Sequence, residues 1–240
     1  MANRHLVLLA LAAVTGPGLV SMACGSGSGS LSGSGGKSGS GGAAAAGGAS
    51  GTGGAGAACS NVTACGGDLV GAWMVASSCL RVTGDLDLSL VGAGCPSAPV
   101  TGDLQVTGTW TANADGTYTD DTTTSGTEQL ALAPACLVIS STPVTCSGAA
   151  GLLTSLGYSS LTCTSAADGG CDCTATVHQT AGLGQVSPAP STAGNYTPAG
   201  NLVTLTEDSG DAPYAYCASG NTLTLTPQST SPVVTGTIVL

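Results

Sequence analysis

Residues 85–90 are Asp-Leu-Asp-Leu-Ser-Leu, in which three leucines alternate strictly with polar side chains. Successive side chains of an extended strand point to opposite faces, so this period of two predicts a half-buried β-strand. The same alternation predicts strands over residues 171–176, 202–206, 221–226 and 235–240. Several short strands rich in Thr and Val are typical of an antiparallel barrel or sandwich, and we expect an all-β domain.

Short turn signals separate the expected strands, because Gly, Asn and Asp adopt positive φ angles at little cost. These signals are Thr83-Gly84-Asp85, Asp115-Gly116, Ala199-Gly200-Asn201 and Ser219-Gly220-Asn221. One stretch departs from the pattern. Leu152, Leu153 and Leu156 have the spacing of a short helix between residues 147 and 158, although three glycines in this stretch weaken it.

The N-terminus has the features of an export signal. Arg4 precedes an apolar run over residues 6–14, which is too short to span a bilayer, and the junction Ser21-Met22-Ala23-Cys24 consists of small residues. We predict a signal peptide over residues 1–23. Ordinary signal-peptidase cleavage and lipid attachment at Cys24 both fit the junction. Lipidation is favoured because it leaves an even ten cysteines for an oxidising compartment.

Residues 25–58 are almost entirely Gly, Ser or Ala, with Leu31, Lys37 and Thr52 as the exceptions. A chain of this composition cannot form a core, and we predict a disordered low-complexity linker from the lipid-attachment residue Cys24 to residue 58. Its end-to-end distance would be about 30 Å. Residues 59–240 are then the folded domain, held by a membrane anchor in the cell envelope and facing the periplasm or exterior.

The predicted domain is strongly acidic, with thirteen Asp and Glu residues against a single Lys or Arg residue, Arg81. This balance excludes nucleic acid as an expected partner. The sequence does not identify a protein partner. It contains seven aromatic residues and no phenylalanine, so the expected core is mainly aliphatic.

Several segments resemble bacterial lipoproteins. Residues 21–24 resemble the lipobox, although Ser21 stands where that motif usually has Leu. Residues 69–75, Leu-Val-Gly-Ala-Trp-Met-Val, resemble the opening strand of lipocalin-like domains, and Gly-x-aromatic segments recur at Gly108-Thr109-Trp110 and Gly194-Asn195-Tyr196. The cysteine-bearing segments 159–163, 169–174 and 216–224 are similar to those of lipoproteins with such a domain. The resemblance implies an antiparallel up-and-down lipocalin-like barrel with one short helix, and it implies no single activity.

The ten cysteines after residue 58 are predicted to form five disulfides, because exported chains oxidise their thiols. They are Cys59, Cys65, Cys79, Cys95, Cys136, Cys146, Cys163, Cys171, Cys173 and Cys217. A zinc site with Cys171, Cys173 and His178 is disfavoured because a second cysteine pair is missing. Cys171 and Cys173 share one face of a strand and should reach different partners. We expect no metal and no cofactor.

Catalytic groups are scarce, and we do not expect an enzyme. His178 is the only conventional base of the domain, and alternation places it opposite Cys171 and Cys173, on a solvated face. The carboxylate pairs Asp85 with Asp87 and Asp120 with Asp121 are expected to be solvated. Residues 113–116 partly match a calcium loop, but a hairpin turn is favoured, and residues 207–211 are expected to be a solvated acidic loop.

Two functional hypotheses remain open at this stage. In the first, the barrel binds a small apolar ligand, with Trp73 closing its base and aliphatic side chains lining the cavity. The lining residues would be Leu86, Leu88, Leu90, Leu104, Val106, Leu223 and Leu225. In the second, the protein is a structural or adhesive surface protein whose barrel is filled by its own side chains. The volume of the interior discriminates between them.

Overall fold

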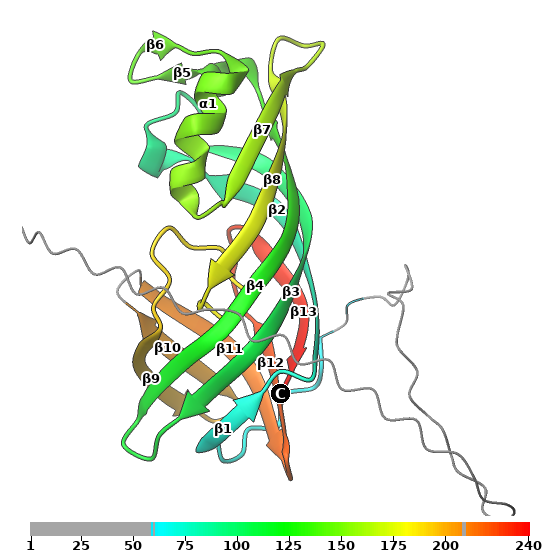
Figure 1. Ribbon diagram of the computed structural model, residues 1–240, viewed down its shortest axis with the longest axis vertical. Coiled ribbons are helices and arrows are strands. Elements are labelled where there is room, and N and C mark those ends of the chain that lie inside the picture. The colour runs from blue at the N-terminus through cyan, green and yellow to red at the C-terminus, as the bar shows by residue number, and fades with distance from the viewer. Residues whose placement is uncertain (1–58, 60, 208–209) are drawn as a thin grey trace, which may run out of the picture. The chain divides into compact units, whose positions relative to one another are not determined.

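Antiparallel strand pairing organises the part of the chain that the computed structural model describes, residues 59, 61–207 and 210–240 (Figure 1). The predicted signal peptide, Cys24 and the linker to residue 58 lie outside the described residues. The main strands are β1 (Gly71–Met74), β2 (Ser77–Asp87), β3 (Ser97–Ala112), β4 (Thr117–Leu132), β7 (Ser160–Ser165), β8 (Cys171–Thr180), β9 (Ala193–Ala199), β10 (Leu202–Glu207), β11 (Gly210–Ser219), β12 (Thr222–Pro227) and β13 (Val233–Val239).

The remaining elements are short. They are the two-residue strands β5 (Val138–Ile139) and β6 (Thr142–Pro143), the α-helix α1 (Cys146–Leu153), and the 3-10 turns η1 (Ser89–Val91), η2 (Pro134–Leu137) and η3 (Thr154–Leu156). Thr145 caps α1, since its Oγ1 accepts a hydrogen bond from the Gly148 N–H at 3.2 Å. The prediction of a mainly antiparallel β structure with one short helix is confirmed.

Eight of the described strands form a closed ring of hydrogen-bonded pairs. The order β3-β2-β13-β12-β11-β10-β9-β4 returns to its start because β3 also pairs with β4. The chain follows the ring in sequence order, apart from the segment inserted between β4 and β9. Closure gives β2, β3, β10 and β11 paired neighbours on both sides, whereas the β12–β13 and β4–β9 pairings cover only two and three residue pairs.

Strand β4 is shared between the ring and the inserted segment. Its first residues, Thr117–Thr119, pair with β9, whereas residues 123–132 pair with β8, which in turn pairs with β7. Helix α1 packs against β7. In Figure 1, α1, β5 and β6 lie beside the upper parts of β7 and β8, and β9–β13 lie around the lower part of β4. The long strands β2, β3 and β4 connect both regions.

Four of the five alternating stretches form the strands that they predicted, in β8, β10, β12 and β13. The prediction for residues 85–90 is wrong beyond Asp87. There the Asp87 carboxylate accepts a hydrogen bond from the Ser89 N–H at 2.8 Å, and the chain turns into η1. Leu90 is consequently 77% exposed instead of facing inward.

Three of the four predicted turns are confirmed. Residues 115–116 lie in the β3–β4 connection, and residues 199–201 and 219–221 contain the β9–β10 and β11–β12 connections. The turn predicted at residues 83–85 is wrong. These residues lie inside β2 and pair with residues 99–101 of β3. Gly84 does have a positive φ of 106°, but the flanking pairs keep it in the ladder.

All ten described cysteines are paired, as predicted: Cys59–Cys79, Cys65–Cys217, Cys95–Cys136, Cys146–Cys171 and Cys163–Cys173. Cys171 binds the first residue of α1 and Cys173 binds a residue of β7, so the prediction that they reach different partners is confirmed.

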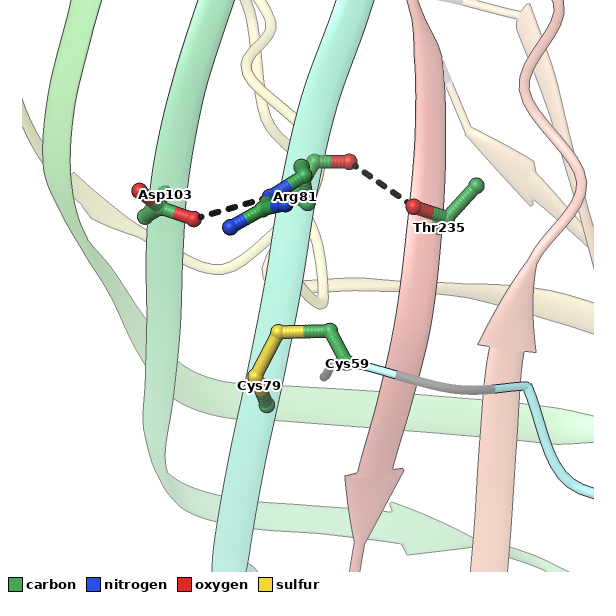
Figure 2. A network of polar contacts seen from close by, with 5 residues as sticks. All are labelled: Cys59, Cys79, Arg81, Asp103 and Thr235. Atoms are coloured by element: carbon green, nitrogen blue, oxygen red, sulfur yellow. Dashed lines mark hydrogen bonds and ion pairs between the residues drawn. A yellow bond between two sulfur atoms is a disulfide. The ribbon is translucent and has the colours of Figure 1, made fainter. Parts of the chain in front are cut away.

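The segment before β1 is attached to the outside of the ring at both ends. Cys59 is bonded to β2 through Cys79, and Cys65 is bonded to β11 through Cys217. Between them, the Gly236 N–H of β13 donates to Asn61 Oδ1 at 2.8 Å. Figure 2 shows the Cys59–Cys79 bond close to the ion pair between Arg81 and Asp103, whose side chains are mostly exposed. We call the described residues of this segment, 59 and 61–66, the strap.

Candidate functional site

The predicted ligand-lining residues do not form one continuous surface. Leu104, Val106, Leu223 and Leu225 are buried together in the core formed by the inner faces of the strands. Leu88 is buried beyond the end of β2, Leu86 is half-buried and Leu90 is exposed. Trp73 is also half-buried, and its Nε1 donates to the Leu69 carbonyl at 2.8 Å.

The fully buried indole is that of Trp110 on β3, not Trp73. The Trp110 ring packs near the rings of Tyr118 and Tyr196, with centroids 6.0 and 6.1 Å away. Both tryptophans follow the same Gly-x-aromatic pattern, which gives no information on which one occupies the interior. Burial of Trp110 fills a large volume that a guest would otherwise take.

A chain segment fills another part of the interior. Residues 181–185, which we call the plug, follow β8 and enter the core, where Ala181 and Leu183 are both 0% exposed. Four consecutive plug residues, Ala181 to Gly184, have positive φ angles. At Gly184 the backbone lies so close to Leu80 that a Cβ atom would overlap with its Cδ1. A left-handed run containing two non-glycine residues persists only when the surroundings hold it in place.

Buried polar groups hold the plug. The Leu183 N–H donates to Asp120 Oδ2 at 3.2 Å, and the Gly184 N–H donates to Thr124 Oγ1 at 3.0 Å. The Tyr214 hydroxyl donates to the Leu183 carbonyl at 3.3 Å. Burial raises the pKa of Asp120, although its hydrogen bonds with Thr122 and Leu183 oppose this change. Asp120 is therefore a buried acid with a structural role, because it helps to hold the plug in the core.

A small pocket lies between the plug, η3 and the β12–β13 connection, and a more open one of about 270 Å³ lies on the other side of Gly182 and Gln185. The volume of the small pocket is about 90 Å³. Leu86 and Leu104 are the two predicted ligand residues that line it. The complete lining is Val82, Leu86, Leu104, Glu128, Leu156, Tyr158, Gln185, Val186, Ser229, Ser231, Pro232 and Val234. Most of these side chains are aliphatic, and Glu128 is the only acid among them.

The strand register explains how Glu128 fits into this wall. Glu128 of β4 lies between Gly102 of β3 and Ala175 of β8, and both neighbours are small. A Cβ atom at residue 102 would lie 2.6 Å from Glu128 Cγ, so the glycine leaves the space that the glutamate stem occupies. On the other side of Gly102 the same row continues to Val82 and Val234, which line the pocket.

The Glu128 carboxyl is almost completely buried, with 2% of the residue exposed. The Tyr158 hydroxyl donates to its Oε2 at 2.6 Å. Burial raises the pKa of Glu128, and the hydrogen bond from Tyr158 opposes that change only in part. Burial and the nearby negative charge of Glu128 raise the pKa of the Tyr158 hydroxyl. The site therefore offers a desolvated carboxyl group at the edge of an apolar pocket.

Sequence analysis missed Glu128, although a signal was present. In Glu128-Gln129-Leu130-Ala131-Leu132 the acid has the same parity as two leucines, so alternation puts a carboxylate on the apolar face. The tyrosine partner could not be found this way, because Tyr158 lies thirty residues later in the inserted segment.

The other sequence candidates lie apart from this pocket. His178 is exposed on the outer face of β8, opposite the buried residues Cys171 and Cys173, as predicted. The expectation that Asp120 and Asp121 are both solvated is wrong for Asp120, which is buried, whereas Asp121 is exposed. These neighbours point to opposite faces of β4 and do not form a carboxylate pair.

The two acidic loops have different outcomes. Residues 113–116 form a hairpin turn, in which Asp115 Oδ1 accepts hydrogen bonds from the Thr117 N–H and hydroxyl. Residues 208 and 209 of the second loop lie outside the described residues. Within the described part of the chain, no three His, Cys, Asp or Glu side chains are grouped so that they could hold a metal ion.

Residues 59, 61–207 and 210–240 include no helix with the length and apolar character needed to cross a membrane. Comparison of the chain with protein-family models, curated proteins and solved structures found no match.

Proposed function

We propose that this chain is an exported, lipid-anchored lipoprotein of the bacterial cell envelope, and that its folded part is a lipocalin-like β-barrel serving as a structural or adhesive surface module. The closed ring of antiparallel strands in sequence order supports the barrel. The signal-peptide features of residues 1–23 and the Gly/Ser/Ala composition of residues 25–58 support export and display.

The observation that carries this proposal is the filled interior. Pockets for drug-sized ligands have volumes of about 300 to 1,000 Å³. The pocket beside Glu128 has about 90 Å³, because the plug and Trp110 occupy the space between the strands. A wider hollow of about 580 Å³ beside β1 is an open surface groove. The geometry therefore favours a self-filled barrel over a carrier of acyl chains.

The proposal includes no catalytic activity. Residues 59–240 contain one histidine, one arginine and no lysine. The histidine lies on the outer face of β8, away from the buried Glu128 and Tyr158. General acid–base catalysis needs such groups within hydrogen-bond reach of one another and of a substrate.

The test is uptake of an apolar guest. Native mass spectrometry of the protein purified from its own host should show the mass of the polypeptide and its anchor alone. A dansyl-labelled fatty acid should gain no fluorescence with residues 59–240, because the plug leaves no room for its chain. Leu183→Ala is the matched control, since truncating this buried side chain removes plug volume and should increase uptake. A stoichiometric bound lipid, or a saturable fluorescence signal with the unmodified domain, would overturn this proposal and favour apolar-ligand binding instead.

A further inference from the structure

The pocket beside Glu128 has no role in a self-filled display module, and its chemistry points to a ligand. An ionised carboxylate can accept about four hydrogen bonds. Glu128 accepts one, from Tyr158, and no described residue donates to its Oε1. The residue is 2% exposed, so only a small part of the carboxyl group reaches solvent. Buried carboxylates are normally paired with a cation or hydrogen-bonded by several donors.

The protein cannot supply the missing cation from its folded part. Arg81 is the only Lys or Arg residue in the sequence after residue 58. Its side chain is 61% exposed on the outside of β2, where Nε lies 3.4 Å from Asp103 Oδ1 (Figure 2). When Glu128 is ionised, its counter-ion must therefore come from solution. The excess of acids over bases gives the domain a negative potential that attracts cations.

The walls of the pocket define the rest of the ligand. Val82, Leu104, Val186 and Val234 line the same pocket as Glu128, and the volume of about 90 Å³ suits a short alkyl group. The two serine hydroxyls of the lining each make one hydrogen bond within the protein, since Ser229 Oγ accepts from the Val234 N–H and Ser231 Oγ donates to the Asp85 carbonyl, both at 3.0 Å. Hard metal ions prefer several carboxylate ligands, whereas Glu128 is the only carboxylate of this lining and belongs to no metal-binding group of the described residues.

We propose that this pocket binds a small aliphatic ammonium ion, with Glu128 Oε1 accepting its N–H groups and the aliphatic walls surrounding its alkyl chain. A charge-assisted hydrogen bond of this kind is about twice as strong as one between neutral groups. The inference does not depend on the role of the display module, because it uses only the geometry of the pocket.

The test is titration of residues 59–240 with n-butylammonium chloride at pH 8 and fixed ionic strength, followed by calorimetry and ligand-observed NMR. We expect saturable binding with one site, and no competition from butan-1-ol or sodium butyrate. Glu128→Gln keeps the shape of the side chain and should weaken binding at least tenfold. Asp172→Asn, which removes an exposed acid from the outer face of β8, should leave the affinity unchanged.

Val186→Phe is the second variant. It leaves Glu128 in place and narrows the pocket at a partly exposed residue, so it tests the site even if Glu128→Gln does not fold. We expect it to abolish binding while circular dichroism stays unchanged. The proposal is overturned if n-butylammonium does not bind, if butan-1-ol binds equally well, or if the folded Glu128→Gln and Val186→Phe variants bind as the unmodified domain does.

Discussion

Glu128 shows at the level of one residue how a strand pattern creates a site. Alternation predicts the face of its side chain, and the pairing with Gly102 makes the space beside β3. Neither fact predicts that Tyr158 donates to the carboxyl, because that contact depends on how the inserted segment folds back. A sequence can therefore indicate an unusual buried acid but not its partner.

The two tryptophans illustrate the same limit. Trp73 and Trp110 occur in similar local sequences, and the resemblance to lipocalin-like domains selected Trp73 for the base. In the structure Trp110 is fully buried between β1 and β4, whereas Trp73 remains half-buried at the edge of the sheet. Burial depends on strand neighbours, and the sequence does not specify them.

Glu128 should give the domain an unusual dependence of stability on pH. Its pKa is raised in the folded state by burial, as is that of Asp120. Folding therefore disfavours the ionised forms of these two carboxyl groups. Their protonated forms contribute fully to the free energy of unfolding below the unfolded-state pKa values of about 4, and this contribution is lost as the pH rises through the folded-state pKa values. Asp87 and Asp115, whose pKa values are lowered, act in the opposite direction but only at lower pH.

We therefore expect the free energy of unfolding, measured by urea denaturation with the disulfides intact, to decrease between about pH 4.5 and pH 8. Glu128→Gln should make this decrease shallower, and the exposed-site control Asp172→Asn should not. Tyr158 is the titratable side chain described in contact with Glu128, and the raised pKa keeps its hydroxyl neutral throughout this range. A Glu128→Gln profile parallel to that of the unmodified domain would contradict the assignment.

At the level of elements, strands were predictable where alternation was uninterrupted. β8 has five buried residues that alternate with exposed ones, and its strand was predicted from Cys171 onward. The plug was not predicted, because Thr180-Ala181-Gly182-Leu183-Gly184 has no period and resembles a surface turn. Its buried position depends on Asp120, Thr124 and Tyr214, which come from β4 and β11.

The plug should contribute strongly to stability despite its loop-like sequence. Leu183 is 0% exposed, and Leu183→Ala should lower the free energy of unfolding by about 2 to 5 kcal/mol through lost burial and a residual cavity. Leu90→Ala is the matched control, because that leucine is 77% exposed and its truncation should change stability by less than about 0.5 kcal/mol. Equal effects of the two substitutions in denaturant titrations would show that the plug does not pack in solution as described.

At the level of the whole molecule, cross-links compensate for a core with few aromatic side chains. The Cys65–Cys217 bond joins residues 152 positions apart and so connects the strap to β11. In the chain-entropy model a loop of this length corresponds to about 5 kcal/mol of stabilisation. The strap thereby fixes the start of the domain to β2 and β11. Such an attachment suits a module that is held from its N-terminal side.

The same cysteine pairing sharpens the prediction for the anchor. Five disulfides use all ten cysteines of residues 59–240, so none of these remains as a partner for Cys24, the eleventh cysteine. A lipidated Cys24 would leave no unpaired thiol in an oxidising compartment. The linker of residues 25–58 would then hold the acidic domain about 30 Å from the membrane, where repulsion from anionic lipid is screened by salt.

We accordingly expect the full chain, expressed in a bacterial host, to be found in the membrane fraction and to incorporate radiolabelled palmitate. Cys24→Ser should abolish the label and release the protein into the soluble fraction, because a domain with thirteen acids and one base has no electrostatic attraction to anionic lipid. Ser26→Ala, two residues further on, is the control and should remain labelled and membrane-bound. Label that persists in Cys24→Ser, or unmodified protein found wholly in the soluble fraction, would refute the anchor and leave a secreted chain with an odd thiol to be explained.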